Sequence, residues 1–551
     1  MDINQTIKGR NLIFLLPLIG ISFLFIKFIF HDIHAGTDEL RTTFVAKEIA
    51  ERGNVYFTDQ NNSTYGTNIF IKTGFLINEN KTIYPFGFTI NSIILVPLLS
   101  LTKDSVFAFN LFALTCFILS YLTIYQIFIK LKIKVSVSII GSVIFSITNY
   151  NLAMYVNYYP DFLLSLLFLI LINTVVGFEV TKKRSYFFIL PILSSFLLSY
   201  KITMYPILFT FFILYLPFLR KFKQVKFSSI FVFIFVLIIS LFIFNIPQLS
   251  TSIIGKPYGD LVGGNNQLTE NTEIVTFSYK VNQLTSKFFS EYLFPKENGK
   301  WLMWHLKNDF IFFSSNNIIV LFGLLISTVY LSRKNKPLFI VVTLLFATSF
   351  ILWGNMNFYG GDVPDLTNLR NTHTRYMLPI ITLFYILGFF YLSKIIKNHY
   401  LLMILLVCIF IRTCISITNQ YPFLQYSLIN KTSFINSYRD EKKFIFNLNI
   451  PKNSFFVSAT VDDYDLSYHF DNYANLRTSS DNLNEIETVL NRLINNKEGK
   501  SVYLLIPKLP GRFDPIKKEE LDTLNKYIGV TFSKKILMDN RYRQLFLLSK
   551  K

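Results

Sequence analysis

The sequence has 551 residues, of which 52% are hydrophobic and only 16% are charged, and its mean hydropathy is +0.41. This composition excludes an ordinary soluble protein and favours a chain whose main solvent is the lipid bilayer. The formal net charge of +20 would suggest nucleic-acid binding in a soluble protein, but much of the Lys and Arg lies in short clusters between apolar runs, as in cytoplasmic loops, so we expect no nucleic-acid partner.

The first apolar run, 11–30, follows Lys8 and Arg10 as a signal sequence would. No small-residue cleavage site follows it, so we predict that it is a retained first span. Other apolar runs are about 17–25 residues long, enough to cross a hydrocarbon core of ~30 Å. They predict spans at 105–129, 135–152, 161–178, 186–201, 204–219, 227–247, 313–332, 338–354, 376–393 and 399–418.

Basic links between these spans predict their direction. The five links that are rich in Lys or Arg are 130–134, 182–184, 220–226, 333–336 and 394–397. With the N-terminus inside, all five lie in the cytoplasm. We therefore expect a mainly α, multi-pass protein of the plasma membrane, with about eleven transmembrane helices and its C-terminus outside.

The apolar segment 85–101 is not included in this count, because a crossing there would reverse the sidedness of every later basic link. We predict a re-entrant or interfacial helix, of the kind that Pro85 and Pro97 permit. It belongs to an outer loop, 31–104, of a transmembrane domain that covers residues 1–425.

Residues 430–551 differ in composition, since charge rises and the long apolar runs stop. We predict a small extracytoplasmic α/β domain here. Patterns typical of strands occur at 454–460, 501–506, 530–537 and 544–548, and helical periodicity occurs at 483–496 and 517–528.

Two acidic residues, Asp38 and Glu39, lie in the first outer loop just before an amphipathic segment, 42–52. They are candidate catalytic carboxylates, or else they are only first-turn acids that the helix dipole favours. The nearby His31 and His34 suggest a metal, but this run lacks a third placed ligand. We therefore expect no metal site and no required cofactor.

Further charged residues are predicted at the same outer face. Asp161 begins an apolar span, where a buried ion is costly unless it has a task or caps the helix after Pro160. Lys201, between two apolar runs, either acts at this face or only extends its amine to the interface. Arg375 precedes Tyr376 at the mouth of the tenth span, and a guanidinium can hold a phosphate by two oxygens. Such a set could deprotonate an acceptor while holding a lipid-linked phosphate leaving group, as sugar transfer from a polyprenyl-phosphate donor requires.

The order of these motifs resembles the GT-C-type glycosyltransferases that use lipid-phosphate sugars, of the protein mannosyltransferase and aminoarabinose transferase kind. The resemblance covers residues 10 to about 395 and includes Gly36–Glu39, Tyr84–Gly87, Tyr159–Asp161, Tyr200–Lys201 and Arg375–Tyr376. It implies that one sugar is transferred with inversion from a polyprenyl-phosphate donor to an extracytoplasmic lipid, glycan or protein, at the outer face of the membrane.

The resemblance also gives each candidate residue a role. Asp38 corresponds to the general base, Glu39 stands beside it, and Asp161 positions the acceptor or assists the base. The residues that correspond to the donor-phosphate site and the lipid groove are Lys201, Arg375 and Tyr376.

Two departures from the family limit what the resemblance implies. Leu40 and Arg41 stand where the family usually has aromatic residues, which leaves the sugar and the acceptor open. The double-tryptophan motif of the oligosaccharide-transferring relatives is absent, because the tryptophans are Trp301, Trp304 and Trp353. We therefore do not expect transfer of a whole glycan to asparagine.

Two alternatives remain. A transporter or flippase of lipid-linked sugars would also be polytopic and basic, but it should have paired inverted halves and ionisable residues near the midplane. The sequence has no such repeat, and its candidate residues lie at span ends. A non-catalytic scaffold that presents residues 430–551 would not explain Asp161 or Lys201.

Overall fold

The structure, a computed structural model, describes many of the apolar helices and much of the C-terminal region. The described residues are 12–30, 86–156, 161–200 except 182, 227–253, 318–326, 366–420 and, with gaps, 441–550, together with short stretches and single positions between 42 and 83 and at 208, 329, 333 and 343. They fall into two compact units, one made of the helices up to residue 420 and the other of the strands and the C-terminal helix.

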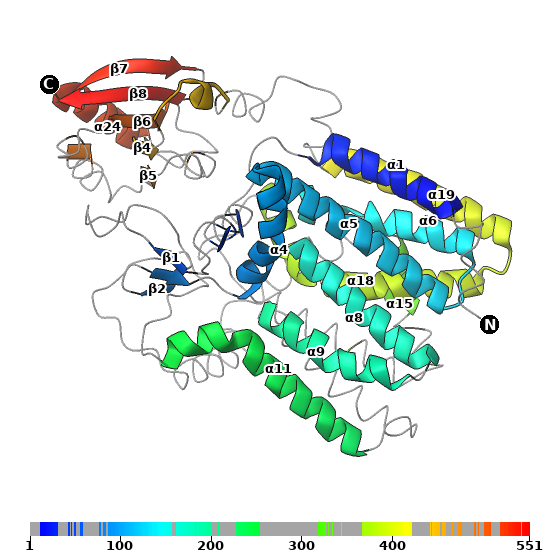
Figure 1. The fold of residues 1–551 in the computed structure, drawn as a ribbon. Helices are drawn as coiled ribbons and strands as arrows, with labels where there is room; N and C mark the ends of the chain where they lie inside the picture. The colour runs from blue at the N-terminus through cyan, green and yellow to red at the C-terminus, as the bar shows by residue number, and fades with distance from the viewer. Residues whose placement is uncertain are drawn as a thin grey trace, which may run out of the picture. The chain divides into compact units, whose positions relative to one another are not determined.

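The first unit is a bundle of apolar helices (Figure 1). Its helices are α1 (Leu12–Phe28), α4 (Phe86–Thr102), α5 (Ser105–Lys130), α6 (Val135–Ser146), α7 (Asn149–Val156), α8 (Asp161–Thr181), α9 (Arg184–Tyr200), α11 (Phe227–Ile253), α15 (Ile318–Ile326), α18 (Leu366–Ile395) and α19 (His399–Gln420). Aromatic rings fill much of the space between them, and Tyr121 and Phe128 of α5 are fully buried. The predicted spans 204–219 and 338–354 lie outside the described residues, apart from one position in each.

Basic residues gather at one end of this bundle. The Lys130 amine, in the last turn of α5, lies 2.8 Å from Asn173 Oδ1 of α8 and 5.4 Å from the ring centre of Tyr186 in α9. Phe128 stacks on Phe389 of α18 with ring centres 4.5 Å apart. The C-terminal parts of α5, α8 and α18 and the start of α9 therefore meet here. We call this the Lys130 end, and its other exposed cations are Lys132, Lys134, Lys183, Lys394 and Lys397.

The outer surface of the bundle is apolar. Both α5 and α8 are long and apolar enough to cross a membrane. The shorter apolar stretches of helix among the described residues are Leu16–Lys27, Ile90–Thr102, Val135–Ser146, Ser185–Tyr200, Ser228–Phe244, Ile381–Ile395 and His399–Ile415. Along α11, Phe231, Phe235, Ile238 and Phe242 form an exposed stripe. Lipid stabilises such a surface and water does not, which agrees with the predicted polytopic, mainly α class. The count of eleven spans and their direction stay predictions.

The predicted span 135–152 is interrupted. Helix α6 ends at Ser146, and α7 begins at Asn149. The Asn151 side-chain amide donates to the Ser146 carbonyl at 3.0 Å, and the Thr148 hydroxyl donates to the Phe145 carbonyl at 2.7 Å. These side chains give the last carbonyls of α6 partners other than a continuing helix. Hydropathy missed the break because its apolar neighbours outweigh three or four polar residues.

The apolar segment 85–101 forms helix α4, which lies at a steep angle to α5 and α8 (Figure 1). It contacts α5, α9 and α11. The chain then turns through Lys103, whose φ of 55° is left-handed, to Asp104. The Asp104 carboxylate accepts the Phe107 N–H at 3.0 Å and so caps α5. Whether α4 lies at the membrane interface stays a prediction.

The bundle also contains two very close helix approaches, at glycines. A Cβ added to Gly388 of α18 would lie 2.2 Å from the carbonyl oxygen of Ile319 in α15, and one added to Gly323 would contact the Phe384 carbonyl. A Cβ on Gly141 of α6 would contact the Phe389 ring. Small residues of this kind let membrane helices pack backbone to backbone.

The second unit contains a five-stranded sheet of order β5-β4-β6-β8-β7. Strands β4, β5 and β6 are parallel, while β8 is antiparallel to both of its neighbours. Alternate residues enter two cores, as Leu504 and Leu505 do on opposite faces. The elements are β4 (Phe455–Ser458), β5 (Asn472–Asn475), β6 (Val502–Pro507), α24 (Lys518–Thr531), β7 (Phe532–Asp539) and β8 (Arg543–Lys550). The four predicted strands coincide with β4, β6, β7 and β8, whereas β5 was not predicted.

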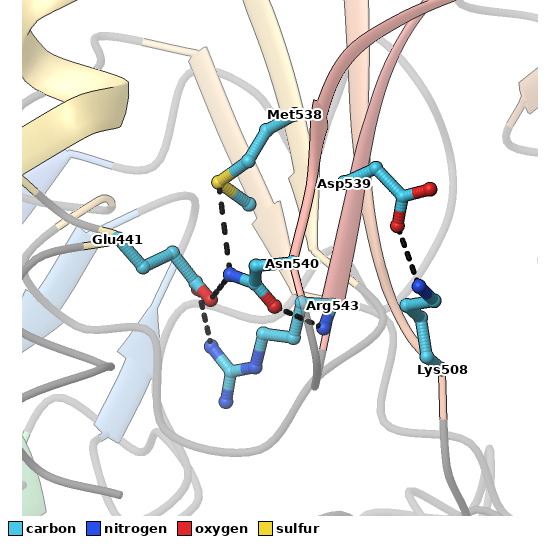
Figure 2. A network of polar contacts seen from close by, with 6 residues as sticks. All are labelled: Glu441, Lys508, Met538, Asp539, Asn540 and Arg543. Carbon is cyan, nitrogen blue, oxygen red and sulfur yellow. Dashed lines mark hydrogen bonds and ion pairs between the residues drawn. The ribbon is translucent and has the colours of Figure 1, made fainter. Parts of the chain in front are cut away.

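A buried ion pair ties Glu441, which precedes β4 in the chain, to the β7–β8 turn (Figure 2). Arg543 Nη1 lies 3.3 Å from Glu441 Oε1, and both side chains are 3% exposed. The Asn540 amide donates to Glu441 Oε2 at 2.7 Å, and its own oxygen accepts the Arg543 backbone N–H at 2.7 Å. Nearby, Lys508 and Asp539 form a more exposed pair at 2.6 Å.

The second unit also contains a small antiparallel sheet that was not predicted, of order β1-β3-β2. Its strands are β1 (Tyr56–Thr58), β2 (Leu76–Asn78) and β3 (Lys81–Ile83). Within the predicted amphipathic segment 42–52, five positions are described and all are helical: 42, 43, 46, 49 and 50. Thr42, Thr43 and Ala46 are buried, whereas Ala50, one turn after Ala46 on the same side of a helix, is exposed.

Candidate functional site

Several elements that lead to predicted site residues reach the end of the bundle opposite the Lys130 end. The last part of α1 runs antiparallel to α5, and Phe30 packs against Phe107 near the start of α5 with ring centres 6.5 Å apart. Helix α8 begins with Asp161, and its Phe162 packs against Phe112 of α5 at 5.1 Å. We call this the Asp161 end.

Asp161 is the first residue of α8 and is only 4% exposed. The next residue, Phe162, stacks on Tyr155 of α7 with ring centres 5.2 Å apart and packs edge-on against Phe109 at 5.8 Å. The aspartate therefore sits at a helix start in aromatic surroundings, where the free N–H groups of the first turn favour negative charge. This position is that of a first-turn acid inside the helix, not of a cap residue before it, and the catalytic role of Asp161 stays a prediction.

Helix α9 brings the chain back toward the Asp161 end. Its start lies at the Lys130 end, where Phe187 packs against Phe178 of α8 with ring centres 5.7 Å apart. It ends at Tyr200, whose hydroxyl lies 2.7 Å from Nδ2 and 3.0 Å from Oδ1 of Asn91 in α4. The predicted phosphate ligand Lys201 follows directly in the chain and lies outside the described residues.

Arg375 and Tyr376 lie inside helix α18, because α18 begins at Leu366, ten residues before the predicted span. The Tyr385 hydroxyl donates to the Gly141 carbonyl of α6 at 2.7 Å, one turn before the ring contact at the Lys130 end. Arg375 lies ten residues earlier, about 15 Å along the helix axis and away from that end. Helix α18 also contacts α7 and α8.

A proline modifies this part of α18. Pro379 is inside the helix and stands four residues after Arg375. It has no N–H, so the Arg375 carbonyl does not receive the usual helical hydrogen bond. The side chains of Arg375 and Tyr376 lie outside the described part of the structure, and their roles stay predictions.

The first acidic pair, Asp38 and Glu39, also lies outside the described residues. Helix α1 ends at Phe28, ten residues before Asp38. Within the described ranges, no three His, Cys, Asp or Glu side chains lie close enough together to hold a metal ion. His31 and His34 lie beyond those ranges, so the metal expectation is untested.

One residue near the predicted site was missed in the sequence. Asn91 is a single amide within the apolar run of α4, and it is 1% exposed. Its partner Tyr200 is 109 positions away. A polar residue in an otherwise apolar segment was a signal that a buried partner exists, but only the fold shows which residue it is.

No protein-family model matches the sequence, and no curated protein matches it either. Solved structures do resemble it. The crystal structure of ArnT from Cupriavidus metallidurans bound to undecaprenyl phosphate has a TM-score of 0.54 and 9% identity, over 97% of each chain. The Archaeoglobus fulgidus oligosaccharyltransferase, in complex with Zn and sulfate, has a TM-score of 0.51 and 12% identity, over 97% of this chain and 73% of the other. The chain therefore has a GT-C-type glycosyltransferase fold, as its sequence motifs predicted.

Proposed function

We propose that this protein is a membrane glycosyltransferase that transfers one sugar, with inversion, from a polyprenyl-phosphate donor to an extracytoplasmic lipid, glycan or protein. The observation that carries the proposal is the fold similarity to ArnT over 97% of both chains, because the ArnT structure is bound to undecaprenyl phosphate. The transporter alternative has no comparable support among the similar structures reported above.

The arrangement of helix ends supports the same conclusion. The start of α8, the end of α9 and the N-terminal half of α18 all lie toward the Asp161 end, and these elements carry or lead to Asp161, Lys201 and Arg375. An acid and two cations gathered there, as we propose, would suit a substrate that has a charged phosphate and a lipid tail. The phosphate would meet the cations while the tail stays among apolar helices and lipid.

In the proposed reaction, Asp38 accepts the proton of an acceptor hydroxyl as its oxygen bonds to the anomeric carbon of the donor sugar. The bond between that carbon and the phosphate oxygen breaks, and both its electrons leave with polyprenyl phosphate. Lys201 and Arg375 stabilise the charge on the departing phosphate, and Tyr376 lines the lipid groove. Glu39 and Asp161 position the acceptor or assist Asp38. Attack on the face opposite the phosphate inverts the anomeric carbon.

The proposal predicts that Asp38→Asn abolishes transfer without preventing donor binding. Loss of a general base lowers the rate by about 100-fold or more, since such groups contribute 10²–10⁴. Membranes that contain the full-length protein would be given undecaprenyl phosphate carrying radiolabelled hexoses or pentoses, and transferred label would be counted. Binding of labelled undecaprenyl phosphate to the purified variant would be measured in parallel.

Asp104→Asn is a matched control for this test. Asp104 is an exposed acid that caps α5, and Asn caps a helix nearly as well, so this variant should keep both transfer and binding. Full transfer by Asp38→Asn would show that Asp38 is not the base. If the wild-type protein transferred none of the labelled sugars and did not bind undecaprenyl phosphate, the proposed class of donor would be wrong.

A further inference from the structure

Helices α4 and α9 are joined by a reciprocal contact between two buried polar side chains. The Asn91 amide nitrogen lies 2.7 Å from the Tyr200 hydroxyl, which in turn lies 3.0 Å from the Asn91 carbonyl oxygen. Asn91 is 1% exposed and Tyr200 is 8% exposed. The hydroxyl can therefore donate to one atom of the amide and accept from the other, and water cannot easily replace either partner.

Contacts of this kind are uncommon in the described part of the bundle, where most buried hydroxyls bond to their own helix. Ser142, Thr174 and Ser194, for example, each donate to the carbonyl four residues earlier. A hydroxyl that bonds within its own helix does not constrain a neighbouring helix. The Asn91–Tyr200 pair does, because each group loses its partner if the two helices shift.

The Asn91–Tyr200 pair lies at the end of α9, next to a predicted site residue. Tyr200 is the last residue of α9, and Lys201 follows it in the chain. Asn91 belongs to α4, which also packs against α5 and α11 and is therefore held from several sides. The contact therefore holds Tyr200, and with it the end of α9, against α4.

We propose that Asn91 is a positioning residue for the donor phosphate: by holding Tyr200 it fixes the end of α9, from which the chain continues directly to Lys201. This inference rests on the proposed function, in which Lys201 binds the phosphate of the polyprenyl donor. Asn91 acts through Tyr200 and touches no substrate. A cation one residue from a fixed helix end can be held in place before the donor arrives, which reduces the entropy that binding must overcome.

The test measures the affinity of full-length protein in lipid nanodiscs for labelled undecaprenyl phosphate. Asn91→Leu and Tyr200→Phe should each weaken binding by about tenfold, the factor that corresponds to one buried hydrogen bond. The double variant should lose no more than either single variant, because both remove the same contact. In a Lys201→Ala background, Asn91→Leu should have no further effect on binding.

Asn173→Leu is the matched control, since it also removes an Asn amide that joins two helices, through Lys130 and Gln126, at the far end of the bundle. It should leave binding unchanged. Thermal unfolding of every variant separates a lost contact from a lost fold, and Tyr200→Phe, which removes a single oxygen, serves if Asn91→Leu does not fold.

The possible outcomes distinguish this inference from the proposed function. If Lys201→Ala weakens binding but Asn91→Leu and Tyr200→Phe do not, the positioning role is wrong and the proposed function stands. If Lys201→Ala itself binds normally, the assigned phosphate ligand is wrong. If Asn91→Leu weakens binding equally with and without Lys201, the pair acts on the general shape of the bundle and the inference fails.

Discussion

The helix bundle and the C-terminal sheet unit satisfy their buried polar groups in different ways. In the bundle, hydroxyls such as those of Ser146 and Thr413 bond to a carbonyl of their own helix. In the sheet unit, Glu441 and Arg543 are buried against each other although 102 positions separate them. A helix in lipid must satisfy its polar groups before it meets its neighbours, whereas a sheet unit can bury a charge pair as it assembles.

The difference shows where the bundle depends on precise contacts between helices. A polar contact holds two helices at one distance and direction, and a glycine crossing leaves no room for a side chain between them. In the described part of the bundle such constraints include Asn91–Tyr200, Tyr385–Gly141 and the crossing at Gly388. Two of these involve α18, which carries Arg375, and the third lies directly before Lys201.

The largest effect is expected from Glu441→Leu in the sheet unit. It leaves the Arg543 guanidinium buried without its carboxylate, which costs about 3–5 kcal/mol. Hydrogen exchange of β6 and β8 in the full-length protein should become faster, while exchange in α5 and α8 should not change. The double variant Glu441→Leu, Arg543→Met should recover much of the protection, because it removes both charges. Unchanged exchange in Glu441→Leu would mean that the buried pair does not hold this unit together.

A smaller loss is expected from Gly388→Ala in the bundle. Its methyl group would meet the Ile319 carbonyl oxygen 2.2 Å away, so α15 and α18 must separate. Overpacking of this kind costs about 1–3 kcal/mol. The thermal unfolding temperature of detergent-purified protein should fall. Gly20→Ala is the control, since nothing lies within 4 Å of its added Cβ, and this variant should be as stable as the wild type or more so. Equal stability of the two variants would contradict the close crossing.

The smallest effect concerns the exposed pair at the sheet edge. The hydrogen bond from Lys508 holds the pKa of Asp539 below its usual value. A carboxylate with a lowered folded-state pKa stabilises the fold above its unfolded pKa, and this contribution disappears as the pH falls through the folded-state pKa. In Lys508→Met the pKa of Asp539 should rise, as an NMR titration of labelled aspartate carboxyls would show, with little change in stability at neutral pH. A pKa that did not move would mean that Lys508 does not hold this carboxylate.

Much of the helical framework could be predicted from the sequence. Helix α5 covers 105–130 against a predicted 105–129, and α19 covers 399–420 against 399–418. These agreements arise because a span in lipid must be continuously apolar, and the sequence displays that requirement directly. The strands β6, β7 and β8 were found because alternation of apolar residues is equally local.

The sequence-based predictions differ from the structure where a few specific contacts outweigh the local hydropathy pattern. The break between α6 and α7 depends on side chains such as Thr148 and Asn151, which bond to nearby carbonyls. The early start of α18 lies in a polar stretch that hydropathy assigned to a loop. The short strands of the sheet β1-β3-β2 are stabilised by partners along the chain and have no distinctive pattern of their own.

The candidate site shows the same division. Asp161 was predicted from the sequence, since an acid at the head of an apolar run is conspicuous, and the structure finds it buried at the start of α8. Asp38, Glu39 and Lys201, together with the side chains of Arg375 and Tyr376, stay predictions. Apolar helices and the charges at their ends could be recognised without a structure, because hydrophobicity and charge are properties of single residues. The contact of Asn91 with Tyr200 and the crossing of α15 and α18 at Gly388 required the folded chain, because such contacts join residues far apart in the sequence and depend on how whole helices pack.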